Sequence, residues 1–290
     1  RQMQKRLNRY TVNYWAKEFM EALNSKLEPT EKSDVKKLDK ATVQVIAESC
    51  SHAAKKMVLL DYDGTLVDFH ENPEMAVPDE SLLETLAQLA LLPNTDVAIV
   101  SGRDMVFLEK WFGNLQLTLV AEHGYFVKVH RQEWLAKSGD TNSWKKDVMP
   151  IMEAFTDRTP GTFIEEKSKS LVWHYRKTDP ELAAGRAVEI KTVLNSLISD
   201  KLSIMDMDKA LEVVNRQISK GTAVSELVAK KKYDFILCMG DDVTDENMFT
   251  SLPNHATTIK VGRKKTAAKY YIEDIAQVKV LLSTLAKGNG

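Results

Sequence analysis

Cysteine is scarce in this chain, which contains only Cys50 and Cys238 among its 290 residues. Two cysteines fit a reducing compartment better than a disulfide framework. Cys238 lies in the apolar run 235–239, where a small core residue is expected. We therefore predict a cytoplasmic protein.

The sequence also lacks a long apolar run and an excess of charge of either sign. No apolar stretch approaches the ~20 residues that a membrane span requires. The formal net charge is −1, so there is no electrostatic case for nucleic acid or an anionic membrane as a partner. No signal peptide is visible, but the chain does not begin with Met, as is usual in a fragment or an excised domain.

Hydrophobic residues make up 43% of the 290 residues, which is enough to bury a sizeable core in two domains. Residues 4–23 are predicted to form an amphipathic helix, and residues 24–31 a linker. A second helix is predicted to begin at Ser33 or Asp34, because either residue could cap it.

From residue 57 onward, short apolar strands alternate with helices, as in a parallel sheet covered on both faces. The first run has predicted strands at 57–61, 96–101 and 117–122 and helices at 79–92 and 104–112. The alternation resumes later, with helices at 222–231, 246–252 and 275–286 and strands at 234–239 and 257–261.

Between these two runs the pattern changes to helices that alternate with strand pairs. The predicted elements are strands at 125–130 with 133–135, 162–167 with 171–176, and 202–205 with 210–214, and helices at 144–156 and 180–198. This repeated pattern predicts an α+β layer inserted at 126–216.

The predicted fold is therefore α/β: a doubly wound, Rossmann-like parallel sheet with an inserted α+β domain. Its parts are an N-terminal helical segment and linker (1–54), a core in two pieces (55–125 and 217–290) and the insertion (126–216). Open α/β sheets bind ligands at the carboxyl ends of their strands, and the polar motifs described next fall at those ends.

The string Asp-Tyr-Asp-Gly-Thr-Leu at 61–66 directly follows the apolar residues 57–60. Two carboxylates forced together repel each other unless a cation or a shared proton relieves them. This suits metal-assisted phosphoryl transfer, in which Asp61 attacks phosphorus. Asp63 would protonate the leaving oxygen and later take a proton from the attacking water. A strand-end turn with a solvated Asx cap explains one aspartate but not the whole string.

Two further motifs predict phosphate binding. Ser101-Gly102-Arg103 ends the second strand, where a hydroxyl and free backbone N–H groups can cradle phosphate; a helix N-cap would explain Ser101 equally well. Lys220 opens a helix after the insertion, where the helix dipole disfavours a cation unless an anion compensates it. Lys220 can neutralise phosphate and the carboxylate pair, although an isolated lysine is more often a solvated surface charge.

Four acids lie within six residues in the string Gly-Asp-Asp-Val-Thr-Asp-Glu at 240–246. So many carboxylates at a strand end call for a cation, and oxygen-rich ligation without thiolate points to Mg²⁺. We predict Asp241 as the direct ligand, with Asp242 and Asp245 behind it. The alternative is a helix-capping acidic turn, since Asp245 and Glu246 also suit a helix start.

These motifs, in this order along an α/β core, resemble the haloacid dehalogenase superfamily of phosphatases, and the finer match is to trehalose-6-phosphate phosphatases. The resemblance covers residues 57–286 and rests on Asp-Tyr-Asp-Gly-Thr-Leu (61–66), Ser-Gly-Arg-Asp (101–104), Ala-Glu-His-Gly (121–124), Lys-Gly (220–221) and Gly-Asp-Asp-Val-Thr-Asp-Glu (240–246).

The resemblance implies a reaction and a set of site residues. The reaction is hydrolysis of the sugar phosphate trehalose 6-phosphate through an aspartyl-phosphate on Asp61, with Mg²⁺ held by Asp61, the main-chain oxygen of Asp63 and Asp241, and with Asp242 at the same metal site. The insertion would be a cap that selects the sugar. The implied substrate-binding residues are Glu122, His123, Gly124, Glu165, Lys167, Arg176, Lys209 and Glu212. From the residues alone, a solvated face explains each of the five charged cap residues about as well.

Three alternatives remain open at this point. The core could serve another sugar phosphatase, such as one for sucrose phosphate, or a phosphomutase that returns phosphate to a sugar hydroxyl. A catalytically silent regulatory domain of a trehalose-synthesis complex should lack at least one reacting group, whereas all are present here. Residues 6–19 resemble the last helix of the synthase domain that precedes the phosphatase in two-domain trehalose proteins. A trehalose-6-phosphate synthase domain or subunit is therefore an expected partner.

Overall fold

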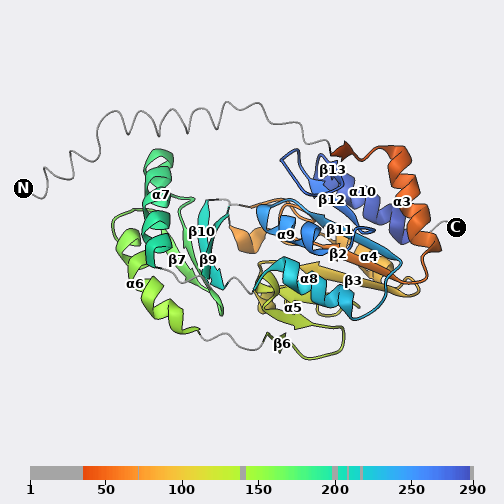
Figure 1. Ribbon diagram of the computed structural model, residues 1–290, viewed down its shortest axis with the longest axis horizontal. Helices are drawn as coiled ribbons and strands as arrows, with labels where there is room; N and C mark the ends of the chain where they lie inside the picture. The colour runs from red at the N-terminus through yellow and green to blue at the C-terminus, as the bar shows by residue number, and fades with distance from the viewer. Residues whose placement is uncertain are drawn as a thin grey trace, which may run out of the picture.

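The computed structural model describes residues 35–70, 72–137, 142–197, 202–207, 209–215 and 218–287. The helix predicted at 4–23 and the linker predicted at 24–31 lie outside these residues. The described chain forms two sheets, which lie side by side in Figure 1 with their covering helices.

The larger sheet has nine strands in the order β1-β13-β12-β11-β2-β3-β4-β5-β6. All neighbours from β1 to β4 are parallel, and β5 and β6 extend the sheet as an antiparallel hairpin. In sheet order the strands are Lys36–Lys37, Tyr270–Ile272, Thr257–Val261, Phe235–Gly240, Lys56–Leu60, Thr95–Val100, Thr118–Ala121, Phe126–Lys128 and Leu135–Ala136.

Helices cover both faces of this sheet, so the predicted doubly wound architecture is confirmed. One face packs on α3 (Lys40–His52), α4 (Glu80–Ala90), α5 (Met105–Phe112) and α10 (Ile275–Lys287). The opposite face packs on α8 (Lys220–Ala229) and α9 (Val243–Ser251).

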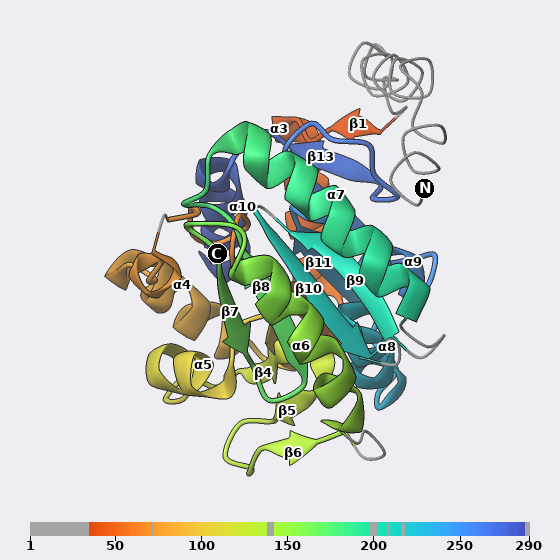
Figure 2. The ribbon, with the colours of Figure 1, turned by 90° about the vertical axis from the view of Figure 1, so that its left-hand side faces the viewer.

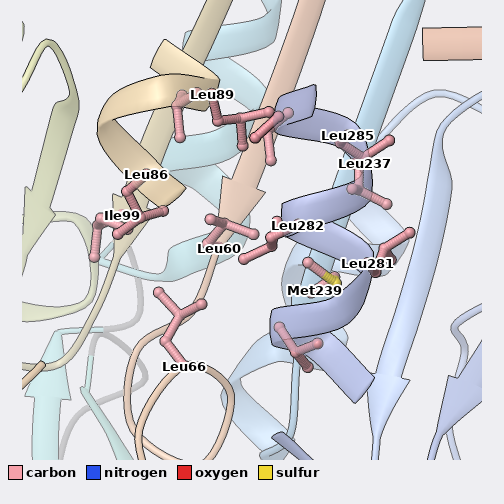
Figure 3. Packing of buried hydrophobic residues seen from close by; sticks show 14 of the residues in the cluster. Leu60, Leu66, Leu86, Leu89, Ile99, Leu237, Met239, Leu281, Leu282 and Leu285 are labelled. Carbon is pink, nitrogen blue, oxygen red and sulfur yellow. The ribbon is translucent and has the colours of Figure 1, made fainter. Parts of the chain in front are cut away.

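The central strands are apolar on both faces because both are buried. Neighbouring residues Leu59 and Leu60 of β2 belong to the two opposite clusters, as the alternation of side chains in a strand requires. Figure 3 shows Leu60 enclosed by leucines of α4 and α10, which include Leu86 and Leu282. Strand β2, which precedes Asp61, is thus buried in the middle of the sheet.

Aspartates determine where several helices begin. Asp79 and Asp104 cap α4 and α5, with side chains that accept hydrogen bonds from Leu82 N and Phe107 N, each at 2.8 Å. The predicted start of the preceding helix at Ser33 or Asp34 is wrong, because Asp39 caps α3. Residues 36–37 form β1 instead, a strand too short to show a periodic pattern.

The smaller sheet has four antiparallel strands in the order β7-β8-β10-β9. In chain order they are Phe163–Glu166, Ser170–His174, Leu202–Met207 and Ala210–Asn215 for β7 to β10. One face packs on α6 (Lys145–Thr156) and α7 (Pro180–Leu197) through buried residues such as Trp173. Figure 2 shows both helices lying over the strands. We call this sheet with α6 and α7 the cap.

The stretch predicted as an insertion, 126–216, does not belong entirely to the cap. Strands β5 and β6 pair with β4 and with each other, so residues 126–136 extend the larger sheet. An antiparallel hairpin at the edge of a parallel sheet produces the same change of pattern as the start of an insertion. Short 3₁₀ helices complete the structure at Pro73–Met75, Glu122–Gly124 and Asn142–Trp144.

Two observations bear on the expected environment. Cys50 and Cys238 are both buried and free. Among the described residues, no helix combines the length and the apolar character needed to cross a membrane.

Candidate active site

The ends of three neighbouring parallel strands bring the first group of predicted residues together. Leu60 of β2 lies beside Met239 of β11 and Ile99 of β3. Asp61 therefore leaves the sheet between the chain segments that lead to Asp241 and to Ser101. Asp61 N also donates to Met239 O at 3.0 Å, which continues the pairing by one residue. The parallel pairing therefore brings residues that are far apart in the sequence to the same edge of the sheet, as predicted.

Asp61 is buried and is anchored by Lys220. One oxygen of Asp61 lies 2.5 Å from Lys220 Nζ, and Thr65 Oγ1 donates to the other at 3.1 Å. Lys220 also contacts Asp245 Oδ1 at 2.7 Å. The lysine at the start of α8 therefore has the compensating anions that its position requires, and the alternative of a solvated surface lysine is excluded.

Gly64 allows Asp241 to approach the turn that follows Asp61. Its φ of +80° lies in the left-handed region, and a Cβ atom at this position would lie 2.4–2.5 Å from the Asp241 carboxylate. Thr65 Oγ1 lies 3.4 Å from Asp241 Oδ1. The turn and the carboxylate thus pack without room for any side chain at residue 64.

Negative charge is in excess at this position. Asp61, Asp241 and Asp245 each offer an oxygen within 4.8 Å of the other two, whereas Lys220 supplies one positive charge. Burial, followed by the charge of Asp245, raises the pKa of Asp61 and raises that of Asp241 to about 6. Burial alone would lower the pKa of Lys220, but Asp245 and Asp61 outweigh it, so this pKa is raised and Lys220 stays charged.

This arrangement fits a divalent cation. The three carboxylates supply only oxygen donors, which Mg²⁺ prefers. A cation here would offset the burial and the mutual repulsion that raise the pKa values of Asp61 and Asp241. The charge excess of the described residues is itself the reason to expect an ion.

The acidic run after β11 serves both the site and the helix that follows. Asp242 is the N-cap of α9, and its side chain accepts from Val243 N at 2.7 Å. Asp245 is fully buried, and its Oδ2 accepts from Asp241 N and Asp242 N, both at 2.9 Å. In contrast to the expectation, Asp245 rather than Asp242 lies in the cluster of carboxylates with Asp61 and Asp241. The predicted metal site and the alternative of a capping turn therefore share this segment.

Asp63 turns away from Asp61 to Arg103. Arg103 Nε donates to Asp63 Oδ2 at 2.8 Å, and Arg103 Nη2 forms an ion pair with the other oxygen, Oδ1. The structure thus places the Arg103 guanidinium on the predicted acid/base, whereas the sequence predicted residue 103 only as part of a phosphate cradle.

Residues 101–103, which we call the phosphate turn, are held by hydrogen bonding and close packing. Ser101 is buried, and its Oγ accepts from Arg103 N at 3.1 Å. Gly102 packs against the ring of His123, which a Cβ atom at residue 102 would approach to 2.7 Å. The turn therefore keeps Ser101 and Gly102 at the end of β3, beside Asp61.

The predicted substrate residues of the larger sheet lie against the cap. Ser168 Oγ donates to Glu122 at 2.5–2.6 Å, and Lys169 N donates to it at 3.2 Å. His123 Nε2 lies 3.0 Å from Glu212 Oε2. Gly124, at φ +108°, is held tightly against α8. The Ala-Glu-His-Gly string is therefore the junction between the two sheets.

Lys167 and Glu212 of the cap reach the same junction. Lys167 Nζ lies 3.3 Å from Gly102 O and 3.5 Å from Glu212 Oε1. Ser170 Oγ also donates to Glu212, at 2.5 Å. Burial alone would raise the pKa of Glu212, but Lys167 and His123 outweigh it and hold this pKa well below its ordinary value. Lys167 thus contacts the phosphate turn, and Glu212 is linked to that turn through Lys167.

The three remaining predicted sugar residues also belong to the cap. Glu165 Oε2 pairs with His174 Nε2 at 2.8 Å, and this contact outweighs burial and lowers the pKa of Glu165. Arg176 and Lys209 are exposed near one end of the cap sheet, where Lys209 O accepts from Tyr175 N at 3.0 Å. The structure therefore brings Lys167 to the phosphate turn, with Glu165 and Glu212 close enough for their charges to act on Lys167. Arg176 and Lys209 lie at the end of the cap sheet.

The site contains residues that the sequence did not assign. Thr65 bonds Asp61, and Ser168 and Ser170 bond the junction carboxylates. Thr65 could have been found, because it lies within the Asp-Tyr-Asp-Gly-Thr-Leu string. Nothing in the sequence marks the two serines, whose role arises from the way the cap meets the larger sheet.

Comparison with known proteins gives a consistent result. The sequence profile of the trehalose-phosphatase family matches residues 59–276. A solved structure, the C-terminal domain of the trehalose-6-phosphate phosphatase of C. albicans, is 32% identical with a TM-score of 0.81; the match covers 87% of this chain and 99% of that one.

Two curated relatives are longer than this chain. The bifunctional trehalose-6-phosphate synthase/phosphatase of Thermoproteus tenax is 40% identical over 98% of this chain and 39% of its own length. The trehalose-phosphatase of Schizosaccharomyces pombe is 39% identical over 99% of this chain and 37% of its own length. This chain therefore spans less than two-fifths of each relative.

Proposed function

We propose a reaction for this chain from one premise: the chain belongs to the trehalose-phosphatase family. The reaction is the hydrolysis of trehalose 6-phosphate to trehalose and phosphate. The observation that carries it is the buried Asp61 carboxylate, 2.5 Å from Lys220 Nζ and in one group with Asp241. A carboxylate held in this way suits attack on phosphorus.

Mg²⁺ is the cofactor that we propose, held by Asp61, the main-chain oxygen of Asp63 and Asp241. The oxygen-only donors and the surplus negative charge among the described residues support it. When bound, the ion supplies positive charge that offsets the phosphoryl oxygens.

The chain's own residues account for the two steps of the reaction. An oxygen of Asp61 attacks phosphorus, and the bond between phosphorus and the sugar oxygen breaks to leave an aspartyl-phosphate. Asp63 gives a proton to the departing oxygen. Asp63 then takes a proton from water as the water attacks phosphorus and releases Asp61. Ser101, Gly102 and Lys220 would hold the phosphoryl oxygens during both steps.

The cap is proposed to select the sugar. Its candidate residues are Glu165, Lys167, Arg176, Lys209 and Glu212, with Glu122, His123 and Gly124 at the junction. Support comes from Lys167, which lies 3.3 Å from Gly102 O, so a cap residue reaches the turn that would hold the phosphate. Charged side chains at this distance can direct hydroxyl groups while the phosphate stays in place.

A cytoplasmic location and a synthase partner complete the proposal. The buried, free cysteines suit a reducing compartment. The Thermoproteus tenax relative is named for synthase as well as phosphatase activity, which supports a trehalose-6-phosphate synthase domain or subunit as the partner.

Phosphate release from trehalose 6-phosphate, sucrose 6-phosphate and glucose 6-phosphate, with Mg²⁺ and with EDTA, tests the proposal. We expect strong preference for trehalose 6-phosphate and loss of activity in EDTA. Equal activity on all three would overturn the role of the cap and keep the core chemistry. No release from any of them would indicate a silent domain.

A further inference from the structure

The guanidinium of Arg103 contacts both carboxylate oxygens of Asp63. Arg103 Nε donates to Asp63 Oδ2 at 2.8 Å, while Nη2 pairs with Oδ1. This two-point contact fixes both the distance and the plane of the carboxylate. A single ammonium group could not fix the plane.

Arg103 is in turn held on its other sides. Nη1 donates to Pro73 O at 2.6 Å, and the guanidinium carbon lies 4.4 Å from the centre of the Phe107 ring. Burial alone would lower the pKa of Arg103, but Asp63 outweighs it and raises the pKa. Arg103 is therefore a fixed cation.

The main chain and the side chain of Arg103 serve different partners. Its backbone N–H donates to Ser101 Oγ at 3.1 Å, within the phosphate turn. Its guanidinium leaves that turn and reaches Asp63. The described contacts of the side chain are thus with the acid/base, the Pro73 carbonyl and two aromatic rings.

We propose that Arg103 is a positioning residue for Asp63 and not a phosphate ligand. The inference rests on the proposed function, because it needs Asp63 as acid and base. A carboxyl group that accepts one bond on each oxygen keeps further lone pairs. Asp63 can therefore carry a proton to the departing sugar oxygen as that oxygen leaves phosphorus, while Arg103 holds its orientation.

The leaving group gives a readout that a merely structural role would not change. A sugar alkoxide needs a proton on departure, whereas 4-nitrophenolate leaves as a stable anion. The ratio kcat/KM includes only the steps up to that departure. With Arg103→Lys, we expect kcat/KM to fall by about 30-fold for trehalose 6-phosphate and by less than about threefold for 4-nitrophenyl phosphate.

A double-mutant cycle with Asp63→Asn separates the two roles. If Arg103 acts through Asp63, adding Arg103→Lys to Asp63→Asn should lower kcat/KM for trehalose 6-phosphate by less than about twofold. If Arg103 binds phosphate, Arg103→Lys should lower kcat/KM equally for the two substrates. The losses caused by Arg103→Lys and Asp63→Asn should then multiply in the double variant. That result would overturn the inference while leaving the proposed function intact.

Controls guard against loss of the fold. Arg263→Lys alters another arginine–carboxylate pair, with Glu273 on the surface, and should leave both substrates unaffected. Thermal unfolding is measured for Arg103→Lys and for Arg103→Gln. If neither folds, Arg103 is a packing residue and the inference is wrong. Wild-type protein inactive on both substrates would overturn the proposed function, and this inference with it.

Discussion

His123 Nε2 lies 3.0 Å from Glu212 Oε2 and joins the turn after β4 to the cap. Both side chains are buried, and His123 has a φ of 56°, in the left-handed region that non-glycine residues rarely adopt. A backbone conformation of this kind persists only where surrounding contacts determine it. The Glu212 carboxylate is one such contact, so the junction is built around a buried negative charge.

That charge should make stability depend on pH. The pKa of Glu212 is lowered on folding, so its ionised form stabilises the fold above the unfolded value of ~4.3. This stabilisation is lost as the pH falls through that value towards the folded pKa. We expect Glu212→Gln to lower the free energy of unfolding by about 2 kcal/mol at pH 7, and the difference from wild type to shrink between about pH 5 and pH 3.

Urea unfolding at each pH measures this difference. Glu226→Gln is the matched control, because Glu226 forms an exposed pair with Lys137 at 2.8 Å and should change stability little. A difference between wild type and Glu212→Gln that stays constant down to pH 3 would contradict the prediction.

Gly64→Ala should damage the site more than an ordinary glycine substitution. Besides the cost of a positive φ, about 1–2 kcal/mol, its Cβ would lie 2.4–2.5 Å from the Asp241 carboxylate. Gly262 has a φ of +88° but open space around it, so Gly262→Ala measures the backbone cost alone. We expect at least about a tenfold loss of turnover for Gly64→Ala and normal turnover for Gly262→Ala.

We would measure turnover and thermal unfolding for both variants and for Gly185→Ala as a further control. Gly185 lies within α7 with nothing near its missing Cβ, so alanine there should stabilise the protein by up to about 1 kcal/mol. Equal behaviour of the variants at residues 64 and 262 would show that the approach of Asp241 does not matter.

Lys220→Met should leave the buried acids without their cation. Removing one partner of a buried ion pair costs about 3–5 kcal/mol, and turnover should fall at least about 100-fold. Lys279→Met, which removes an ion pair with Asp79 at the surface, should cost less than about 1 kcal/mol. Similar unfolding temperatures for the two variants would argue against an essential charge at residue 220.

The meeting of Asp61, Ser101 and Asp241 could be predicted because it follows from parallel strand ends. The sequence shows which residues follow the strands, and parallel pairing places the carboxyl ends of those strands at one edge of the sheet. The partner of Arg103 could not be predicted in this way. A long side chain at the start of a helix can reach several acids, and the choice of Asp63 depends on the Pro73 turn and the Phe107 ring.

The sequence did contain a signal that Asp245, rather than Asp242, lies with Asp61 and Asp241. An aspartate followed three residues later by an acid is the pattern of a capping box, in which the second residue turns back to the helix start. Asp245 makes this turn and accepts from Asp242 N at 2.9 Å. A helical periodicity places residues on a face but does not show this local reversal.

Metal binding should separate Asp241 from Asp242. Free Mg²⁺ at 100 times its dissociation constant should stabilise the wild-type protein by about 2.7 kcal/mol. Asp241→Asn removes one charge from the cluster of Asp61, Asp241 and Asp245 and should abolish most of this stabilisation. Asp242→Asn should keep it, because asparagine also caps a helix and Asp242 lies outside that group. Thermal unfolding with Mg²⁺ and with EDTA measures both. Loss of the Mg²⁺ effect in Asp242→Asn, with Asp241→Asn unaffected, would move the metal ligand to Asp242.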